Sequence, residues 1–292
     1  MMNMSHKQYK AILLDLDGVV VKDGVSLPTP RVVAAIARAQ EWGVVVSLVT
    51  GRPLQRVRQI ADILNITVPV VVEGGARIHD FGRQEDLFTN FIEPAVAHAI
   101  AHFVLDRNLP AIFSSLEHTY STPAHIALRN IYQAGGGFNI REHIDTQYEP
   151  LAEPARLPPI TGIALYPLEE GMEEVWDVLS KFPSLHAVEG ESKSFRGWRV
   201  ITINDIHGTK QHGVMELGKI VGIDPHDMIG VGDQDVDYPL LMACGLKVAM
   251  GNAVQSLKDI ADYVAPSVEE DGLVDVIDKF LLNRNEPFSD RA

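Results

Sequence analysis

Two apolar segments, far apart in the chain, each end abruptly in carboxylates and glycine. The first is 11–18, AILLDLDG, and the second is 228–237, MIGVGDQDVD. Short apolar runs of this kind indicate buried strands of a parallel sheet, whose carboxyl ends line the ligand crevice of an α/β fold. Buried carboxylates need a compensating charge. The segments therefore predict that Asp15, Asp17 and Asp233 share a site with a hard divalent cation, Mg²⁺, and a phosphate.

Strands and helices alternate over the first third and the last third of the chain. Strands are expected at 10–14, 44–49, 68–72, 228–231 and 246–250. Helices are expected at 29–42, 53–64, 210–220, 238–243, 253–260 and 273–282. An early proline and a trailing glycine, Pro30 and Gly43, support the first of these helices. The alternation predicts a parallel sheet with helices on both faces.

The middle of the chain differs, because proline, glycine and histidine become frequent after about residue 80. Its expected elements are helices at 93–106, 124–133 and 169–182 and strands at 111–115, 161–166 and 199–203. These strands are less uniformly apolar, which is typical of an antiparallel sheet with one exposed face. We therefore expect a Rossmann-like, parallel-sheet α/β core formed by 1–84 and 197–292, with an α+β domain inserted at 85–196.

The chain has a net charge of −14 over 292 residues, which argues against a nucleic-acid partner bound through bulk electrostatics. A single cysteine, Cys244, excludes an internal disulfide framework and fits a reducing compartment. The first ten residues lack the apolar segment of a signal peptide, and no apolar stretch is long enough to span a bilayer. The sequence predicts a cytoplasmic protein without a membrane partner, and it leaves the oligomeric state open.

The residues that follow the strands offer a nucleophile and a phosphate site. Asp15 ends the first strand as a candidate nucleophile, and Asp17 could be held protonated as a general acid. The segment 50–52, Thr-Gly-Arg, follows the second strand. Its hydroxyl, accessible N–H groups and guanidinium near a helix start suit a phosphate. Lys210 could add a positive charge to the same phosphate, and Asp233 could complete the metal site.

Taken in order, these elements resemble the motifs of the haloacid dehalogenase-like (HAD) phosphatase superfamily. The four motifs correspond to Asp15-Leu16-Asp17-Gly18, Thr50-Gly51-Arg52, Lys210 and Gly232-Asp233. Signatures of the Cof-like, type IIB branch are similar to the segments 73–76 (EGGA), 250–253 (MGNA), 261–264 (ADYV) and 271–272 (DG). The insertion between the second and third motifs lies where that branch carries its C2 cap.

The resemblance implies a role for each residue. Asp15 would attack phosphorus and form an aspartyl-phosphate, and Asp17 would protonate the leaving group and then activate water. Mg²⁺ would be held by the side chains of Asp15 and Asp233 and by the backbone carbonyl of Asp17. Catalysis would then consist of positioning and of neutralising charge in the transition state.

The phosphoryl oxygens would be held by Thr50, Gly51 and Lys210, with Arg52 beside the phosphate or substrate. The chain is thus predicted to be an Mg²⁺-dependent phosphomonoesterase acting on a small phosphorylated metabolite, for which a sugar phosphate is one candidate. A phosphomutase could use the same aspartyl-phosphate and is a first alternative. A catalytically weak binding or regulatory protein on the same fold is a second.

The chain departs from the family pattern at two positions. Val19 stands where the family usually has threonine, and Val236 occupies the asparagine position of the fourth motif, which is usually Gly-Asp-x-x-Asn-Asp. A polar contact to phosphate or substrate is therefore expected to be missing. Either Asp235 compensates for it in part, or the enzyme is slower or differently selective. Asp237 keeps the second acidic position and is expected to support the metal shell or Lys210.

Overall fold

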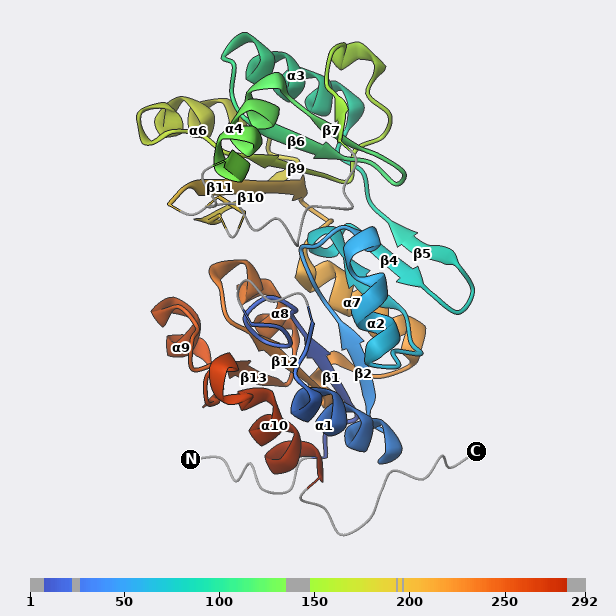
Figure 1. Ribbon diagram of the computed structural model, residues 1–292. Coiled ribbons are helices and arrows are strands. Elements are labelled where there is room, and N and C mark those ends of the chain that lie inside the picture. Colours follow the sequence, from blue (N-terminus) through green and yellow to red (C-terminus); the bar gives the residue numbers. More distant parts are fainter. Residues whose placement is uncertain (1–7, 23–26, 135–147, 193, 196, 283–292) are drawn as a thin grey trace. The chain divides into compact units, whose positions relative to one another are not determined.

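The computed structural model describes residues 8–22, 27–134, 148–192, 194–195 and 197–282. The chain forms two compact units. One contains Met1–Leu87 and Lys210–Ala292, and the other contains Phe88–Thr209 (Figure 1). Among the described residues, no helix combines the length and the apolar composition needed to cross a membrane.

The first unit is built on a five-stranded sheet with the order β14-β13-β12-β1-β2. Its strands are β1 (Ala11–Leu14), β2 (Val45–Leu48), β12 (Met228–Gly232), β13 (Leu246–Ala249) and β14 (Tyr263–Val264). All neighbouring strands of this sheet are parallel. Leu14 at the end of β1 is level with Leu48 on one side and Val231 on the other. The predicted parallel α/β core is therefore confirmed.

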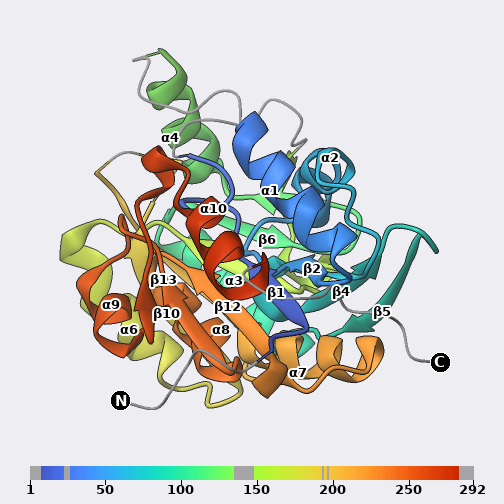
Figure 2. The same cartoon turned by 90° about the horizontal axis from the view of Figure 1, so that it is seen from below.

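Helices cover both faces of this sheet. α1 (Pro30–Glu41), α2 (Arg58–Ile63) and α10 (Gly272–Ile277) lie on one face, and α7 (Lys210–Val221) lies on the other (Figure 2). The remaining helices of the unit are α8 (Tyr238–Ala243) and α9 (Gln255–Ile260). α1 begins where the Thr29 hydroxyl accepts a hydrogen bond from the N–H of Val32, at 3.3 Å. Its buried residues recur at helical spacing: Val32, Ala35, Ile36 and Ala39.

A smaller, three-stranded sheet adjoins β2. It is formed by β3 (Val70–Val72), β4 (Arg77–Asp80) and β5 (Glu85–Thr89). β3 bridges in parallel from Val71 to Val49, just after β2. A tight turn joins β3 to the antiparallel β4, and its residues Glu73, Gly74 and Gly75 have φ values of 55°, 72° and 111°. β5 then leads into the second unit.

The second unit contains a six-stranded sheet with the order β10-β11-β9-β6-β7-β8. Its strands are β6 (Ala111–Ser114), β7 (Thr119–Ser121), β8 (Tyr148–Pro150), β9 (Gly162–Leu165), β10 (Leu185–Glu191) and β11 (Arg199–Asp205). Its helices are α3 (Pro94–Asp106), α4 (Pro123–Ala134) and α6 (Met172–Leu179). The strand pairs are antiparallel except for β7 and β8. This unit has its own hydrophobic core, which packs α3 and α6 against the sheet.

The second unit extends further along the chain than the sequence analysis places the insertion. β11 lies after the predicted boundary at residue 196, yet it pairs with β9 and β10 inside the second sheet. The two units divide at Leu87 and Lys210. The residues of β11 predict a strand but not its sheet, because an apolar strand of this kind suits either unit equally well.

Candidate active site

Three adjacent parallel strands bring the predicted residues together. Asp15 follows β1 directly, Asp233 follows β12, and Thr50 comes two residues after β2. Because these strands are parallel and in register, their carboxyl ends meet at one edge of the sheet. The three residues are buried, with exposed fractions of 7% for Asp15 and 1% each for Thr50 and Asp233. Polar residues buried this deeply need partners from the protein or from a ligand.

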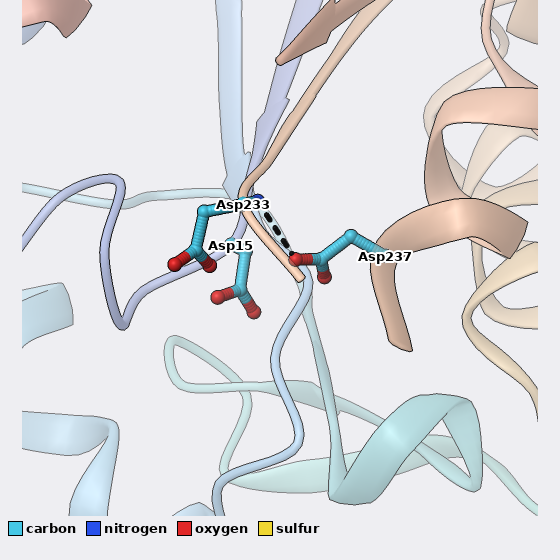
Figure 3. Close-up of side chains that lie close together, drawn as sticks. All are labelled: Asp15, Asp233 and Asp237. Carbon is cyan, nitrogen blue, oxygen red and sulfur yellow. Dashed lines mark hydrogen bonds between the residues drawn. The ribbon is translucent and has the colours of Figure 1, made fainter. Parts of the chain in front are cut away.

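A cluster of buried carboxylates occupies this edge. Carboxylate oxygens of Asp15, Asp233 and Asp237 lie within 4.8 Å of one another (Figure 3). Oδ2 of Asp237 accepts hydrogen bonds from the backbone N–H groups of Asp233, at 3.0 Å, and of Gln234, at 3.1 Å. These two bonds turn the chain back on itself after β12. The turn places two carboxylates from one short segment beside Asp15.

Lys210, the first residue of α7, is buried among these carboxylates. Its Nζ donates to Oδ1 of Asp15 at 2.6 Å and to Oδ1 of Asp237 at 2.5 Å. Burial disfavours the lysine charge, but the two carboxylates outweigh burial and raise the pKa of Lys210 above its ordinary value. Burial and the charge of Asp237 raise the pKa of Asp15 to about 6, although Lys210 acts in the opposite direction. The lysine therefore contacts the side chain that the sequence analysis names as the nucleophile.

Arg52 and Asp17 form a two-point ion pair. Nε of Arg52 donates to Oδ2 of Asp17 at 2.8 Å, and a terminal guanidinium nitrogen donates to Oδ1. From the sequence, Arg52 is expected beside the phosphate or substrate. In the structure, its guanidinium binds Asp17, the carboxylate expected to act as acid and base. A two-point contact of this kind holds a carboxylate in one orientation.

The backbone of the Thr-Gly-Arg segment is held by the turn after β3. The N–H groups of Glu73 and Gly74 donate to the carbonyls of Arg52 and Thr50, each at 3.0 Å. The N–H of Arg52 donates to the Thr50 hydroxyl at 3.2 Å. A Cβ placed on Gly51 would meet no atom within 4 Å, so there is open space beside this residue.

Two amides that the sequence analysis does not assign contact the Asp233 carboxylate. Nε2 of Gln234 and Nδ2 of Asn252 both donate to its Oδ2, at 3.2 Å and 3.4 Å. Asn252 also donates to the carbonyl of Gly18 at 3.0 Å. Gly18 has a φ of +85°, and a Cβ there would lie 2.1 Å from Oδ2 of Asp233, so this approach requires glycine. The position of Asn252, just after the strand beside β12, was the signal that could have identified it.

Asp235 lies apart from the carboxylate cluster. It is exposed, and the Ser256 hydroxyl of α9 donates to its Oδ1. Val236 next to it is half-buried. Side-chain amides therefore reach Asp233 from Gln234 and Asn252, whereas Asp235 is bonded to a neighbouring helix.

The buried side chains fit a divalent cation. Three carboxylates stand against one ammonium group, which leaves two negative charges when all four groups are ionised. Asp237 already accepts bonds from Lys210 and from two backbone N–H groups. Asp15 and Asp233 are therefore the side chains best suited to hold a hard cation with oxygen ligands.

Comparison with known sequences identifies a family for this chain. The profile of the family described as haloacid dehalogenase-like hydrolase matches residues 12–277. The 5-amino-6-(5-phospho-D-ribitylamino)uracil phosphatase YwtE of Bacillus subtilis is 26% identical, with 93% of this chain and 98% of that protein covered. A phosphoglycolate phosphatase of Methanobrevibacter smithii is 27% identical, with the same two shares of 93% and 98%.

Solved structures show the same fold over nearly the whole chain. A haloacid dehalogenase-like hydrolase from B. subtilis superimposes with a TM-score of 0.78 at 23% identity, covering 93% of this chain and all of that one. A sugar phosphatase of HAD subclass IIB gives a TM-score of 0.77 at 21% identity, covering 93% and 98%. The family resemblance noted in the sequence is confirmed by these matches. The chain belongs to the haloacid dehalogenase-like hydrolase family and is a hydrolase whose relatives are named phosphatases.

Proposed function

We propose that this protein is an Mg²⁺-dependent phosphomonoesterase that hydrolyses a small phosphorylated metabolite through an aspartyl-phosphate on Asp15. The observation that carries the proposal is the buried carboxylate cluster at the strand ends, with Lys210 bonded to Asp15 at 2.6 Å. A carboxylate held in one orientation by an ammonium group is a suitable nucleophile for an electron-poor phosphorus.

The first half of the proposed reaction forms the phosphorylated enzyme. A carboxylate oxygen of Asp15 attacks phosphorus, and the bond between phosphorus and the ester oxygen breaks. Asp17 gives its proton to that leaving oxygen, so that a neutral alcohol departs. The Thr50 hydroxyl, the N–H of Gly51 and the Lys210 ammonium would hold the three phosphoryl oxygens. These groups act by position and charge, as is usual in phosphoryl transfer.

The second half releases inorganic phosphate. Asp17, now ionised, takes a proton from a water molecule, whose oxygen attacks phosphorus and displaces the Asp15 carboxylate. In this half-reaction Asp17 is ionised, and Arg52 would orient its carboxylate through their two-point ion pair. The side chains of Asp15 and Asp233 and the backbone carbonyl of Asp17 would hold Mg²⁺. The cation, when bound, supplies positive charge to the phosphoryl oxygens.

We propose sugar and polyol phosphates as the first substrates to test. Two relatives that align over nearly their whole length are named for a phosphoribityl compound and for phosphoglycolate, both small phosphate monoesters. We further propose that the second unit, Phe88–Thr209, is a C2-type cap that selects among such compounds. The proposed catalytic side chains all come from the first unit. The second unit has no proposed part in the chemistry, so we assign it the selection of substrates.

The test is release of inorganic phosphate from a panel of phosphorylated metabolites, with Mg²⁺ and with a chelator. We expect turnover of one or a few sugar or polyol phosphates, and loss of that turnover with the chelator. Asp15→Asn should lower kcat about a thousandfold or more, and Asp17→Asn should accumulate phosphorylated protein. Undiminished turnover by purified Asp15→Asn or by metal-stripped protein would overturn the mechanism. Phosphate moved within one sugar, instead of released, would assign a mutase.

A further inference from the structure

The turn between β3 and β4 places a glutamate in a backbone conformation that usually requires glycine. Glu73, Gly74 and Gly75 are three successive residues with positive φ, a region that glycine enters easily and a glutamate does not. Glu73 is also buried, with an exposed fraction of 6%. A buried carboxylate in a left-handed conformation is unfavourable for two separate reasons, so something in the fold must compensate it.

A chain of buried ionic contacts provides that compensation. The Arg77 guanidinium on β4 lies 3.3 Å from the Glu73 carboxylate, and Arg77 is likewise 6% exposed. Nε of Arg77 also contacts Asp86 on β5 at 2.8 Å, and Nδ1 of His79 contacts the same carboxylate oxygen at 2.7 Å. The turn is therefore anchored through Arg77 to two strands of the small sheet.

The same turn also sets the orientation of the peptide groups in the segment Thr50-Gly51-Arg52. Gly74 donates to the Thr50 carbonyl and Glu73 donates to the Arg52 carbonyl, each at 3.0 Å. In a trans peptide the C=O and N–H bonds point in opposite directions. With the Thr50 carbonyl bound to Gly74, the N–H of Gly51 points away from the turn. An N–H group directed in this way is suited to bind an anion.

We propose that Glu73 is a positioning residue for phosphate binding. Its ion pair with Arg77 holds the left-handed turn in place, and the turn orients the peptide between Thr50 and Gly51 so that the N–H of Gly51 meets a phosphoryl oxygen. This inference rests on the proposed function, because it assumes that phosphate is bound at the Thr-Gly-Arg segment. It gives a role to Glu73 and Arg77, which take no direct part in the proposed reaction.

The experiment measures binding of inorganic phosphate to the Mg²⁺-loaded protein by isothermal titration calorimetry. Arg77→Met should weaken phosphate binding about tenfold, because it removes the ion pair between Arg77 and Glu73. Adding Glu73→Gly to Arg77→Met should restore affinity to within about threefold of wild type, since glycine adopts positive φ without support. His79→Gln is the matched control, because it changes a contact to Asp86 and leaves the ion pair between Glu73 and Arg77 in place, and it should bind phosphate as wild type does.

Should Arg77→Met fail to fold, Glu73→Gln replaces it and is expected to lose affinity severalfold. Wild-type affinity in folded Arg77→Met or Glu73→Gln would overturn the proposal, as would a double variant no better than Arg77→Met alone. Mg²⁺ affinity, measured separately, should not change in any of these variants. Failure of the proposed function itself looks different, because wild-type protein would then bind no phosphate, or Thr50→Val and Lys210→Ala would bind it unchanged.

Discussion

Asn252 is the residue through which the two acidic segments of the site are joined. Its Nδ2 lies between the Gly18 carbonyl and the Asp233 carboxylate, and its Oδ1 accepts from the N–H of Val268 at 2.8 Å. The bond from Val268 fixes which end of the amide faces the acids. Two electronegative oxygens that would otherwise repel one another are thus held by one donor, next to the proposed metal ligands.

Asn252→Ala should weaken Mg²⁺ binding about tenfold, the scale typical of groups that orient a metal ligand. Titration calorimetry with MgCl₂ measures this directly and does not depend on the substrate. Ser267→Ala is a suitable control, because it removes the hydrogen bond to Glu270 in the loop that holds Asn252 while leaving Asp233 untouched. Equal Mg²⁺ affinities for wild type and Asn252→Ala would show that Asn252 only tethers the loop.

Val236 offers a second test at the scale of one residue. It is half-buried, and its neighbour Asp235 is bonded to Ser256. Val236→Asn should restore the missing polar contact and raise kcat/KM about tenfold, equivalent to ~1.4 kcal/mol. Asp235→Ala should change kcat/KM less than about twofold, because a single surface hydrogen bond contributes little. Steady-state kinetics that showed a slower Val236→Asn and a crippled Asp235→Ala would assign the contact to Asp235 instead.

α4 carries a histidine that is buried inside the second unit. His125 has an exposed fraction of 3%, its Nδ1 lies 2.7 Å from the Ser121 hydroxyl, and its ring contacts Tyr166 and Phe195. Burial, and after it the positive charge of Arg129, lower the pKa of His125 to about 4. Because the folded pKa is below the unfolded value, the neutral ring stabilises this unit above pH 6.5. That stability is lost progressively as the pH falls from 6.5 toward 4, and the loss is complete below the folded pKa.

The second unit should therefore lose about 3 kcal/mol of unfolding free energy between pH 6.5 and pH 4 on account of His125. His125→Gln should remove most of this dependence. Urea unfolding followed by tryptophan fluorescence can measure it, since Trp176 and Trp198 lie in this unit. Parallel pH profiles for the variant and the wild type would assign the acid sensitivity to other groups.

The elements that the sequence predicts well are those whose residues share one environment. β1, β2, β12 and β13 are short runs of mainly apolar and mainly buried residues, and the structure has a strand at each. The sequence does not indicate β10, because LHAVEGE is half-buried up to its exposed last residue and has no apolar face in its pattern. β4 was missed for another reason, since Arg77 and His79 are charged or polar yet buried in contact with Asp86.

The site residues that could be predicted are those whose position depends only on the general fold. Asp15, Thr50 and Asp233 could be placed because the ends of parallel strands meet at one edge whatever the rest of the chain does. The partner of Arg52 could not, because the choice between a phosphate and Asp17 depends on side-chain geometry. The position of Asn252 after β13 places it near the site, but no local pattern indicates its contact with Gly18, which is 234 positions away.

At the scale of the molecule, the two ends of the second unit lie next to each other. Nδ2 of Asn90 near one end donates to Oδ1 of Asp205 near the other, at 2.9 Å. A short Gly-Ser linker from Asn90 to Asp205 can therefore replace 91–204. The first unit would keep its sheet and every proposed catalytic residue.

This shortened protein should still hydrolyse a small artificial ester such as para-nitrophenyl phosphate, while losing selectivity across the metabolite panel. The physical reason is that chemistry is assigned to the first unit and substrate selection to the second. Asp15→Asn in the shortened protein is the control for contaminating phosphatase. An unchanged ranking of metabolites by a folded, shortened protein would show that the second unit does not select substrate.

The order of strands in the first sheet also governs how the protein is made. β1 lies between β2 and β12, so one of its neighbours is synthesised early and the other only after Met228 leaves the ribosome. Phe88–Thr209, by contrast, is continuous and emerges complete before then. The inserted unit can thus fold while the N-terminal strands still expose an unpaired edge, which is the feature that chaperones and aggregation both act upon. For this chain, the segment of the first unit that is translated last also contains β12, the second pairing partner of β1.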